Sequence, residues 1–210
     1  MKHVWKRAAG ASLILWVFFT LQSCATLDKM ASVLANLKRL QFKISDVTDF
    51  RLAGIDIGGK SALTQFSAMD ALSLVRAFTS KNLPAAFVLN LQVVNPNNGA
   101  AGAPQTTSTL SSLECRLLID GKQTVTGNID HPFEIPGTGQ ATLVPIRLSL
   151  NLFEFFGDKR YEDLINLALA LGGASRNPSH VALDAQPSVV TPLGSITYPG
   201  RIMIVDKEFR

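Results

Sequence analysis

The stretch Phe87–Val94, which runs into Asn95-Pro96-Asn97, constrains the fold more than any other part of this sequence. Phe87, Leu89, Leu91 and Val93 alternate with a second set of residues that includes two amides. Alternation with a period of two predicts a strand that is packed on one side. Pro96 cannot donate to a β-ladder, and the asparagines beside it favour a turn, so the strand should end there.

Similar runs on both sides of this strand predict a mainly β chain. Gly54 suggests a bulge or bend, residues 98–112 a loop of low complexity, and Asp120-Gly121 a tight hairpin turn. Roughly seven or eight short strands with turn signals between them are typical of an antiparallel β-sandwich. The other predicted strand segments are Leu40–Ile44, Phe50–Ile57, Leu113–Ile119, Lys122–Asn128, Val144–Leu150, Val181–Ala185 and Ile196–Val205.

Two helices are predicted inside this pattern. The first covers Ala68–Phe78, with Ser67 as its N-cap and an apolar side formed by Ala71, Leu72, Leu74, Val75 and Phe78. The second covers Asp158–Leu171, with Asp158 as its N-cap and Gly172-Gly173 as its stop. These helices would cover the core or enclose a cavity.

The amino terminus has the organisation of a secretory signal. Lys2, Lys6 and Arg7 precede an apolar run from Ala8 to Leu21, which is short for a membrane-spanning helix. The run ends in Leu21-Gln22-Ser23-Cys24, which resembles the lipobox of bacterial lipoproteins. This resemblance implies that residues 1–23 are removed and that Cys24 is lipidated. Two or more acyl chains would then hold the protein stably on a membrane.

The lipobox resemblance also implies a location in the bacterial cell envelope, facing the periplasm. Ala25 follows the cysteine where an aspartate would favour retention in the inner membrane, so we expect the outer membrane. Residues 24–39 would form the lipidated cysteine and a tether, and residues 40–207 the folded domain. The tether has helical spacing of apolar residues over Ala25–Lys38, which suits packing on the membrane or on the domain.

Charge gives no reason to expect a nucleic-acid partner. The whole chain carries +4, but residues 1–23 hold three of the 20 Lys and Arg residues and none of the 16 Asp and Glu residues. The mature chain would therefore carry only +1.

Several features together resemble a known family. They are the strand that enters Asn95-Pro96-Asn97, the hairpin through Leu118–Lys122, Ile135-Pro136 before the Val144–Leu150 strand, and the closing Leu193–Pro199 segment. Their order and spacing over Leu40–Val205 are similar to the water-stress and hypersensitive-response (WHy) domain of group 2 late embryogenesis abundant proteins. This resemblance implies an immunoglobulin-like or fibronectin-III-like sandwich that is linked to desiccation and stress tolerance, with no catalytic residues to transfer.

The residues themselves favour a protein without catalytic, cofactor or metal sites. His131 lies in a turn-like Asp-His-Pro sequence, His180 begins a strand, and no nucleophile elbow is present. One remaining cysteine and two distant histidines lack zinc-ligand spacing. Cys115 alternates with leucines and should be a buried, unpaired thiol. Asn95 could bind a polar ligand, but an asparagine before proline more often fixes a turn.

The sequence therefore predicts a lipid-anchored, non-catalytic sandwich that acts by protection or by binding an envelope partner. A periplasmic carrier of an apolar ligand is the main alternative, and an envelope hydrolase is the third. A cavity beneath the helices would favour the carrier.

Overall fold

The computed structural model describes residues 31–100, 105–174, 180–191 and 194–206. The chain divides into two compact units, Met1–Lys38 and Arg39–Arg210. Residues 31–38 are helical, in agreement with the pattern predicted for that part of the tether. Within the described ranges, no helix is both long and apolar enough to cross a membrane.

The first sheet of the second unit has four strands in the order β2-β1-β3-β7, with all neighbours antiparallel. These strands are β2 (Ile55–Asp56), β1 (Gln41–Leu52), β3 (Pro84–Val94) and β7 (Ala141–Asn151). β3 pairs with β7 along its whole length. As predicted, β3 buries Phe87, Leu89, Leu91 and Val93.

The second sheet follows the order β10-β8-β4-β5, while β6 pairs with β4 and β9 pairs with β8. The Asp120-Gly121 turn joins β4 and β5 and has positive φ at both residues, 50° and 76°, as a two-residue hairpin requires. β8 changes its edge partner from β10 to β9 at Pro187, which has no N–H to donate. The strands are β4 (Ser108–Ile119), β5 (Lys122–Gly127), β6 (Phe133–Ile135), β8 (Val181–Thr191), β9 (Gly194–Thr197) and β10 (Ile202–Ile204).

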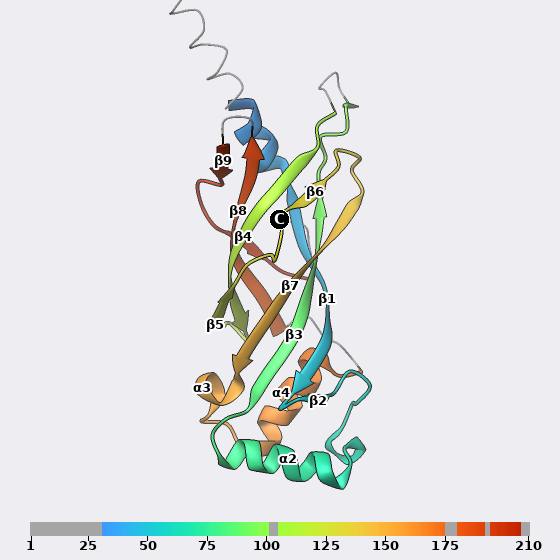
Figure 1. The fold of residues 1–210 in the computed structure, drawn as a ribbon, viewed down its shortest axis with the longest axis vertical. Coiled ribbons are helices and arrows are strands. Elements are labelled where there is room, and N and C mark those ends of the chain that lie inside the picture. Colours follow the sequence, from blue (N-terminus) through green and yellow to red (C-terminus); the bar gives the residue numbers. More distant parts are fainter. Residues whose placement is uncertain (1–30, 101–104, 175–179, 192–193, 207–210) are drawn as a thin grey trace, which may run out of the picture. The chain divides into compact units, whose positions relative to one another are not determined.

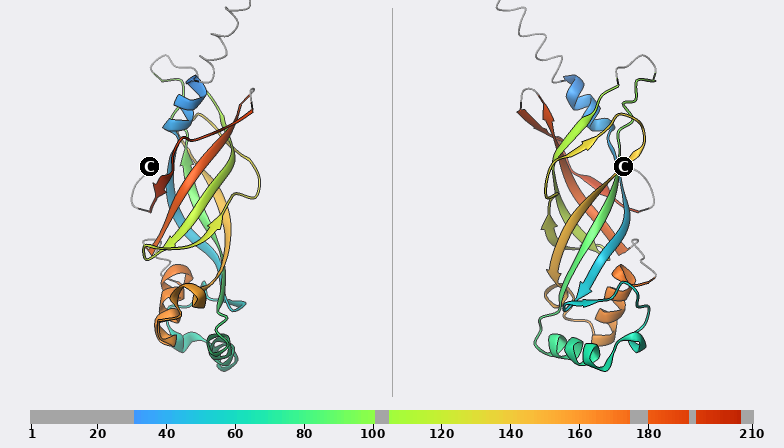
Figure 2. Two further views of the ribbon diagram at one scale, coloured as in Figure 1. Left: turned by 90° about the vertical axis from the view of Figure 1, so that its left-hand side faces the viewer. Right: turned by 45° about the vertical axis from the view of Figure 1, so that its right-hand side comes forward.

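The two sheets face each other, and the helices gather at one end of the sandwich (Figure 1). The helical end consists of α2 (Ala68–Thr79), α3 (Leu152–Phe156) and α4 (Tyr161–Gly172), with a short 3-10 turn at Leu63–Gln65. β1 begins at the opposite end, as both views in Figure 2 show. The predicted antiparallel β-sandwich with inserted helices is therefore confirmed, and the chain enters it at the end away from those helices.

Several strand boundaries differ from the predictions. β8 continues beyond Ala185 to Thr191, and the predicted strand Ile196–Val205 is divided between β9 and β10. β1 is one strand, because irregularities between Ile44 and Asp46 and between Thr48 and Arg51 interrupt the period of two without ending the pairing. Of the bulge or bend predicted at Gly54, the bend is what forms: with Ala53, Gly54 makes a tight turn between β1 and β2, at φ values of 81° and 48°. β4 begins at Ser108, so part of the Thr/Ser run predicted as loop belongs to a strand.

The helices also differ in detail from the predictions. α4 begins at Tyr161 after Arg160 as N-cap, so Asp158 is not its cap, and Gly172 is its last helical residue. α3 was not predicted, because its five residues are too few to show a helical period. Asn151 begins α3 by accepting a hydrogen bond from the backbone N–H of Phe153 at 3.1 Å.

Candidate functional site

Helix α2 has a well-formed amino terminus. The Ser67 hydroxyl accepts a hydrogen bond from the Asp70 backbone N–H at 3.1 Å, and the Asp70 carboxylate accepts one from the Ser67 N–H at 3.2 Å. This reciprocal pair is a capping box, so the N-cap predicted at Ser67 is confirmed. Asp70 is the acidic residue of α2 and lies in its first turn, so the middle of the helix carries no acidic side chain.

The apolar residues of α2 lie on two different sides. Leu74 is completely buried, whereas Met69, Leu72 and Val75 are 70%, 44% and 46% exposed. The prediction of a single apolar side containing Leu72, Leu74 and Val75 is therefore wrong. The exposed residues recur every three positions, which places them along one strip of the helix surface. We call Met69, Leu72 and Val75 the α2 stripe.

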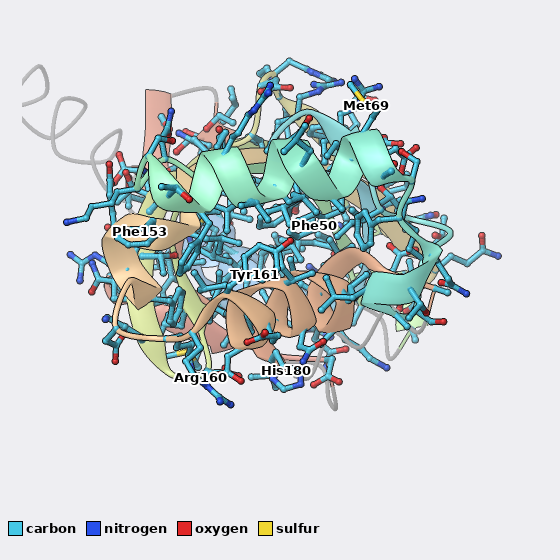
Figure 3. All side chains as sticks on the ribbon, turned by 90° about the horizontal axis from the view of Figure 1, so that it is seen from below. Phe50, Met69, Phe153, Arg160, Tyr161 and His180 are labelled. Carbon is cyan, nitrogen blue, oxygen red and sulfur yellow. The ribbon has the colours of Figure 1, made fainter. Side chains whose placement is uncertain are left out.

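Aromatic rings attach the other side of α2 to the domain. The Phe78 ring meets the rings of Phe153 and Tyr161 edge to face, with both centroid distances at 5.5 Å. Such pairs contribute about 0.5–1.5 kcal/mol beyond the area that they bury. Figure 3 shows Phe153 and Tyr161 at the helical end and Met69 at its margin. The rings and Leu74 hold α2 against the domain, and the α2 stripe lies on the exposed side of the helix.

Exposed large apolar residues elsewhere are scattered. Among the described residues, the three outside α2 are Leu143, Val190 and Met203, which lie on three different strands. Single exposed apolar residues are normal on protein surfaces, whereas a contiguous group marks an interaction site. The α2 stripe is therefore the strongest candidate for a functional surface. Its three-residue spacing was visible in the sequence but does not reveal which side meets the core.

Polar groups near the helical end hold the backbone together. His180 Nδ1 lies 2.6 Å from Asp120 Oδ1, and the Asp120 N–H donates to the His180 carbonyl at 2.9 Å. These contacts fix the β4–β5 turn to the start of β8. The part of the chain that the structure describes contains no cluster of three or more His, Cys, Asp or Glu side chains suited to a metal ion.

The predicted turn motif Asn95-Pro96-Asn97 lies at the opposite end of the sandwich, directly after β3. Asn95 is completely buried. Its Nδ2 donates to the carbonyl oxygens of Thr106 at 2.8 Å and Ile135 at 2.9 Å, and its Oδ1 accepts from the Asn97 N–H at 3.1 Å. One amide thus joins the end of β3 to the segments around β4 and β6.

Backbone contacts also join these segments at what we call the Asn95 junction. The Thr106 N–H donates to the Asn97 carbonyl at 3.0 Å, and the Gly139 N–H donates to the Asn95 carbonyl at 3.1 Å. A Cβ atom at Gly137 would overlap the carbonyl oxygens of Asn97 and Thr106. Three segments therefore meet at backbone distance, and the contacts of Asn95 are those of a structural turn.

Cys115 is buried in β4 and unpaired, as the alternation around it predicts. Burial raises the pKa of its thiol to about 11, although a backbone hydrogen bond from Gly127 and the positive charge of Arg201 oppose this effect. The thiolate is the reactive form of cysteine, so burial and the high pKa both suppress reactivity.

We expect Cys115 to resist thiol reagents at pH 8 in native Cys24→Ala protein and to react at once after denaturation. The same pKa change makes stability depend on pH. The unfolded thiol loses its proton near pH 9.0, while the folded thiol keeps it to about pH 11. Stability should therefore fall across this window, by at most about 3 kcal/mol relative to Cys115→Ala. Rapid labelling of the native protein would show that the thiol is accessible.

Two surface hollows are lined entirely by described residues. One of about 310 Å³ lies over β1, β3 and β7 beside Asp49 and Arg147. The other, of about 440 Å³, lies beside Cys115 and Arg201. Neither is lined by a residue of α2, α3 or α4, so these hollows do not make the helical end a ligand pocket.

The predicted lipidation site, Cys24, lies outside the described residues. No family model and no curated protein matches the sequence. One similar solved structure is the solution structure of a protein described as late embryogenesis abundant (LEA). It is 14% identical, and the match covers 87% of this chain and 84% of that chain with a TM-score of 0.35. Because this TM-score is low, the evidence for the fold is the arrangement of strands in this chain alone.

Proposed function

We propose that this protein is a lipid-anchored, non-catalytic protein of the bacterial envelope that acts by contact through its helical end. The α2 stripe is the observation that carries this proposal. Met69, Leu72 and Val75 expose apolar surface side by side on a helix whose remaining contacts already hold it in place. Exposed apolar surface gains free energy when a partner covers it.

The amino-terminal sequence supports the anchored part of the proposal. Cys24 follows Leu21-Gln22-Ser23 at the end of an apolar run, in the arrangement of a lipobox. An outer-membrane anchor would place the domain in the periplasm, at the end of a tether of residues 24–39. The resemblance to stress-linked WHy domains adds the hypothesis that contact by this domain protects other proteins during water loss.

A carrier of an apolar ligand is the second candidate, and one observation favours it. Phe78, Phe153 and Tyr161 come from α2, α3 and α4, and all three are only partly buried. Rings that meet between three helices could line a ligand site if α2 moved away. A carrier would retain an apolar molecule during purification, whereas a contact protein would not.

One experiment on the full chain tests the proposal. Cells that express wild type or Cys24→Ala are grown with labelled fatty acid, and their membranes are separated. Wild type should incorporate the label and shorten by the signal peptide, while Cys24→Ala should stay unlabelled at precursor length. Labelled mature protein in the Cys24→Ala sample would contradict the proposal that Cys24 carries the lipid anchor.

The labelled wild-type protein is then extracted for bound apolar molecules and compared with an unrelated sandwich in protecting a client enzyme through drying. We expect no stoichiometric ligand and protection above that of the control protein. A stoichiometric lipid together with control-level protection would overturn the contact function in favour of the carrier.

A further inference from the structure

Asn98 differs from the other asparagines of this chain in the residue that follows it. The chain has ten asparagines, and Asn98 alone precedes a glycine. The others precede leucine, isoleucine, proline or asparagine. Asparagine is thermolabile because its side-chain amide can react with the backbone nitrogen of the next residue. Glycine has no side chain to hinder that approach, and it allows backbone conformations that other residues avoid.

The structure leaves the Asn98 side chain exposed, whereas Asn95 and Asn97 beside it are buried. The Asn98 Oδ1 accepts a hydrogen bond from the Ala100 N–H at 3.1 Å. This bond spans Gly99 and folds the Asn98 side chain over the Gly99 peptide. Within the part of the chain that the structure describes, the Asn98 Nδ2 donates no hydrogen bond, so its departure would break no such contact.

We propose that Asn98 is a site of spontaneous deamidation. The Gly99 backbone nitrogen loses its proton and attacks the Asn98 Cγ, which forms a cyclic succinimide and releases the side-chain nitrogen as ammonia. Water then opens the ring at one of its two carbonyl carbons. One opening gives aspartate, and the other gives isoaspartate, in which the backbone runs through the former side chain. Water is the one co-reactant, and the modification does not depend on the proposed contact function.

Other positions with related chemistry are held more firmly. Asp120-Gly121 can form the same ring with loss of water, but its carboxylate lies in a hairpin turn with Oδ1 2.6 Å from His180 Nδ1. Asn90 is buried, and its Nδ2 donates to Asp46 Oδ1 at 2.8 Å, so loss of that nitrogen would break a contact. We therefore expect Asn98 to react first.

Both products should leave the Asn95 junction in place. Aspartate keeps the oxygen that accepts the hydrogen bond within the turn. In isoaspartate, the extra backbone carbon lies between the Cα of residue 98 and the Gly99 nitrogen. That position follows the Asn97 carbonyl, which accepts the Thr106 N–H at 3.0 Å. The reaction therefore adds a negative charge at this end of the sandwich and should leave Tm unchanged.

Peptide mapping of the full chain tests the site. The protein is purified from membranes in detergent, held folded at mildly alkaline pH, and digested at intervals at acidic pH, where the peptide nitrogen keeps its proton. Fragmentation should locate at residue 98 the gain in mass that accompanies replacement of –NH2 by –OH. Labelling with an isoaspartate methyltransferase should find isoaspartate in the same peptide. The other asparagines should keep their amides over the same period.

Two variants test the role of the following residue. Gly99→Val keeps Asn98 but places a branched side chain beside the attacking nitrogen. Its rate of deamidation should fall at least about tenfold, which corresponds to a barrier higher by about 1.4 kcal/mol. Ala100→Val is the matched control, because it adds the same side chain one residue further along and keeps the N–H that donates to Asn98. It should deamidate at nearly the wild-type rate.

Three results would overturn the proposal. The first is an intact amide at Asn98 in the folded protein together with rapid deamidation after denaturation, which would mean that the fold protects the site. The second is an equal rate in wild type and Gly99→Val, which would exclude attack by the Gly99 nitrogen. The third is earlier reaction at another asparagine, or isoaspartate confined to residue 120.

Discussion

Asn95→Asp is expected to lower the free energy of unfolding by about 3–5 kcal/mol, because the substitution keeps the side-chain shape but removes its donor. Asn95 Nδ2 donates to the carbonyl oxygens of Thr106 and Ile135. An ionised aspartate cannot donate, so its oxygen would face both carbonyl oxygens as a buried charge. Thermal unfolding at pH 7 should show the loss as a fall of roughly 6–20 °C in Tm.

A control and a pH series identify the cause. Asn98→Asp changes an exposed asparagine close to the same turn and should alter stability by no more than about 0.5 kcal/mol. The buried aspartate should have a pKa above its unfolded value of about 3.9, so its penalty should grow as pH rises from there. Near pH 4 the variant should recover part of the loss, because a protonated carboxyl group can donate to one of the two carbonyl oxygens but not to both. Equal Tm values for Asn95→Asp and wild type at pH 7 would contradict the buried hydrogen bonds of Asn95 described above.

The position of this junction could be predicted from sequence because its signals are local. Every second residue from Phe87 to Val93 is apolar and buried, and Pro96 lacks a donor two residues after pairing with β7 ends. Asp120-Gly121 was likewise predictable, since few residue pairs accept positive φ at two successive positions. The partners of Asn95 were not predictable, because Thr106 and Ile135 are distant in sequence.

Other parts of the fold depend on contacts that short sequence patterns do not record. Pro145 lies within β7, where it is tolerated because β7 is the edge strand of its sheet. Irregular pairing makes β1 continuous although its sequence looks like two strands. The α2 stripe is a similar case. Its helix could be predicted, but the side that meets the core depends on the Phe78 contacts with α3 and α4.

The contact between α4 and β1 also depends on a close approach that the sequence pattern does not reveal. In sequence, Gly172 is a helix stop. In the structure, a Cβ atom at that position would overlap the Cβ, Cγ and Cδ2 atoms of Phe50. The Phe50 ring is stacked on Phe87, with centroids 5.0 Å apart and planes within 3°. Phe50 is thus held from two sides, and glycine lets the helix approach it.

Gly172→Ala should therefore destabilise the protein by about 2–3 kcal/mol, since one added methyl group must move either α4 or a stacked ring. Chemical denaturation would show this as a lower midpoint with an unchanged slope. Gly59→Ala is the matched control, because no atom lies within 4 Å of the added carbon. It should change stability by no more than about 0.5 kcal/mol.

Phe50→Ala is the partner variant for Gly172→Ala, because it removes the Cγ and Cδ2 atoms that the added methyl group would overlap and leaves only the Cβ atom. Alone, Phe50→Ala should cost stability through its lost packing on Phe87. Combined with Gly172→Ala, it should cost at least about 1 kcal/mol less than the sum of the two single effects. Additive effects would mean that the two residues do not touch, and a neutral Gly172→Ala would contradict the close approach of α4 to β1.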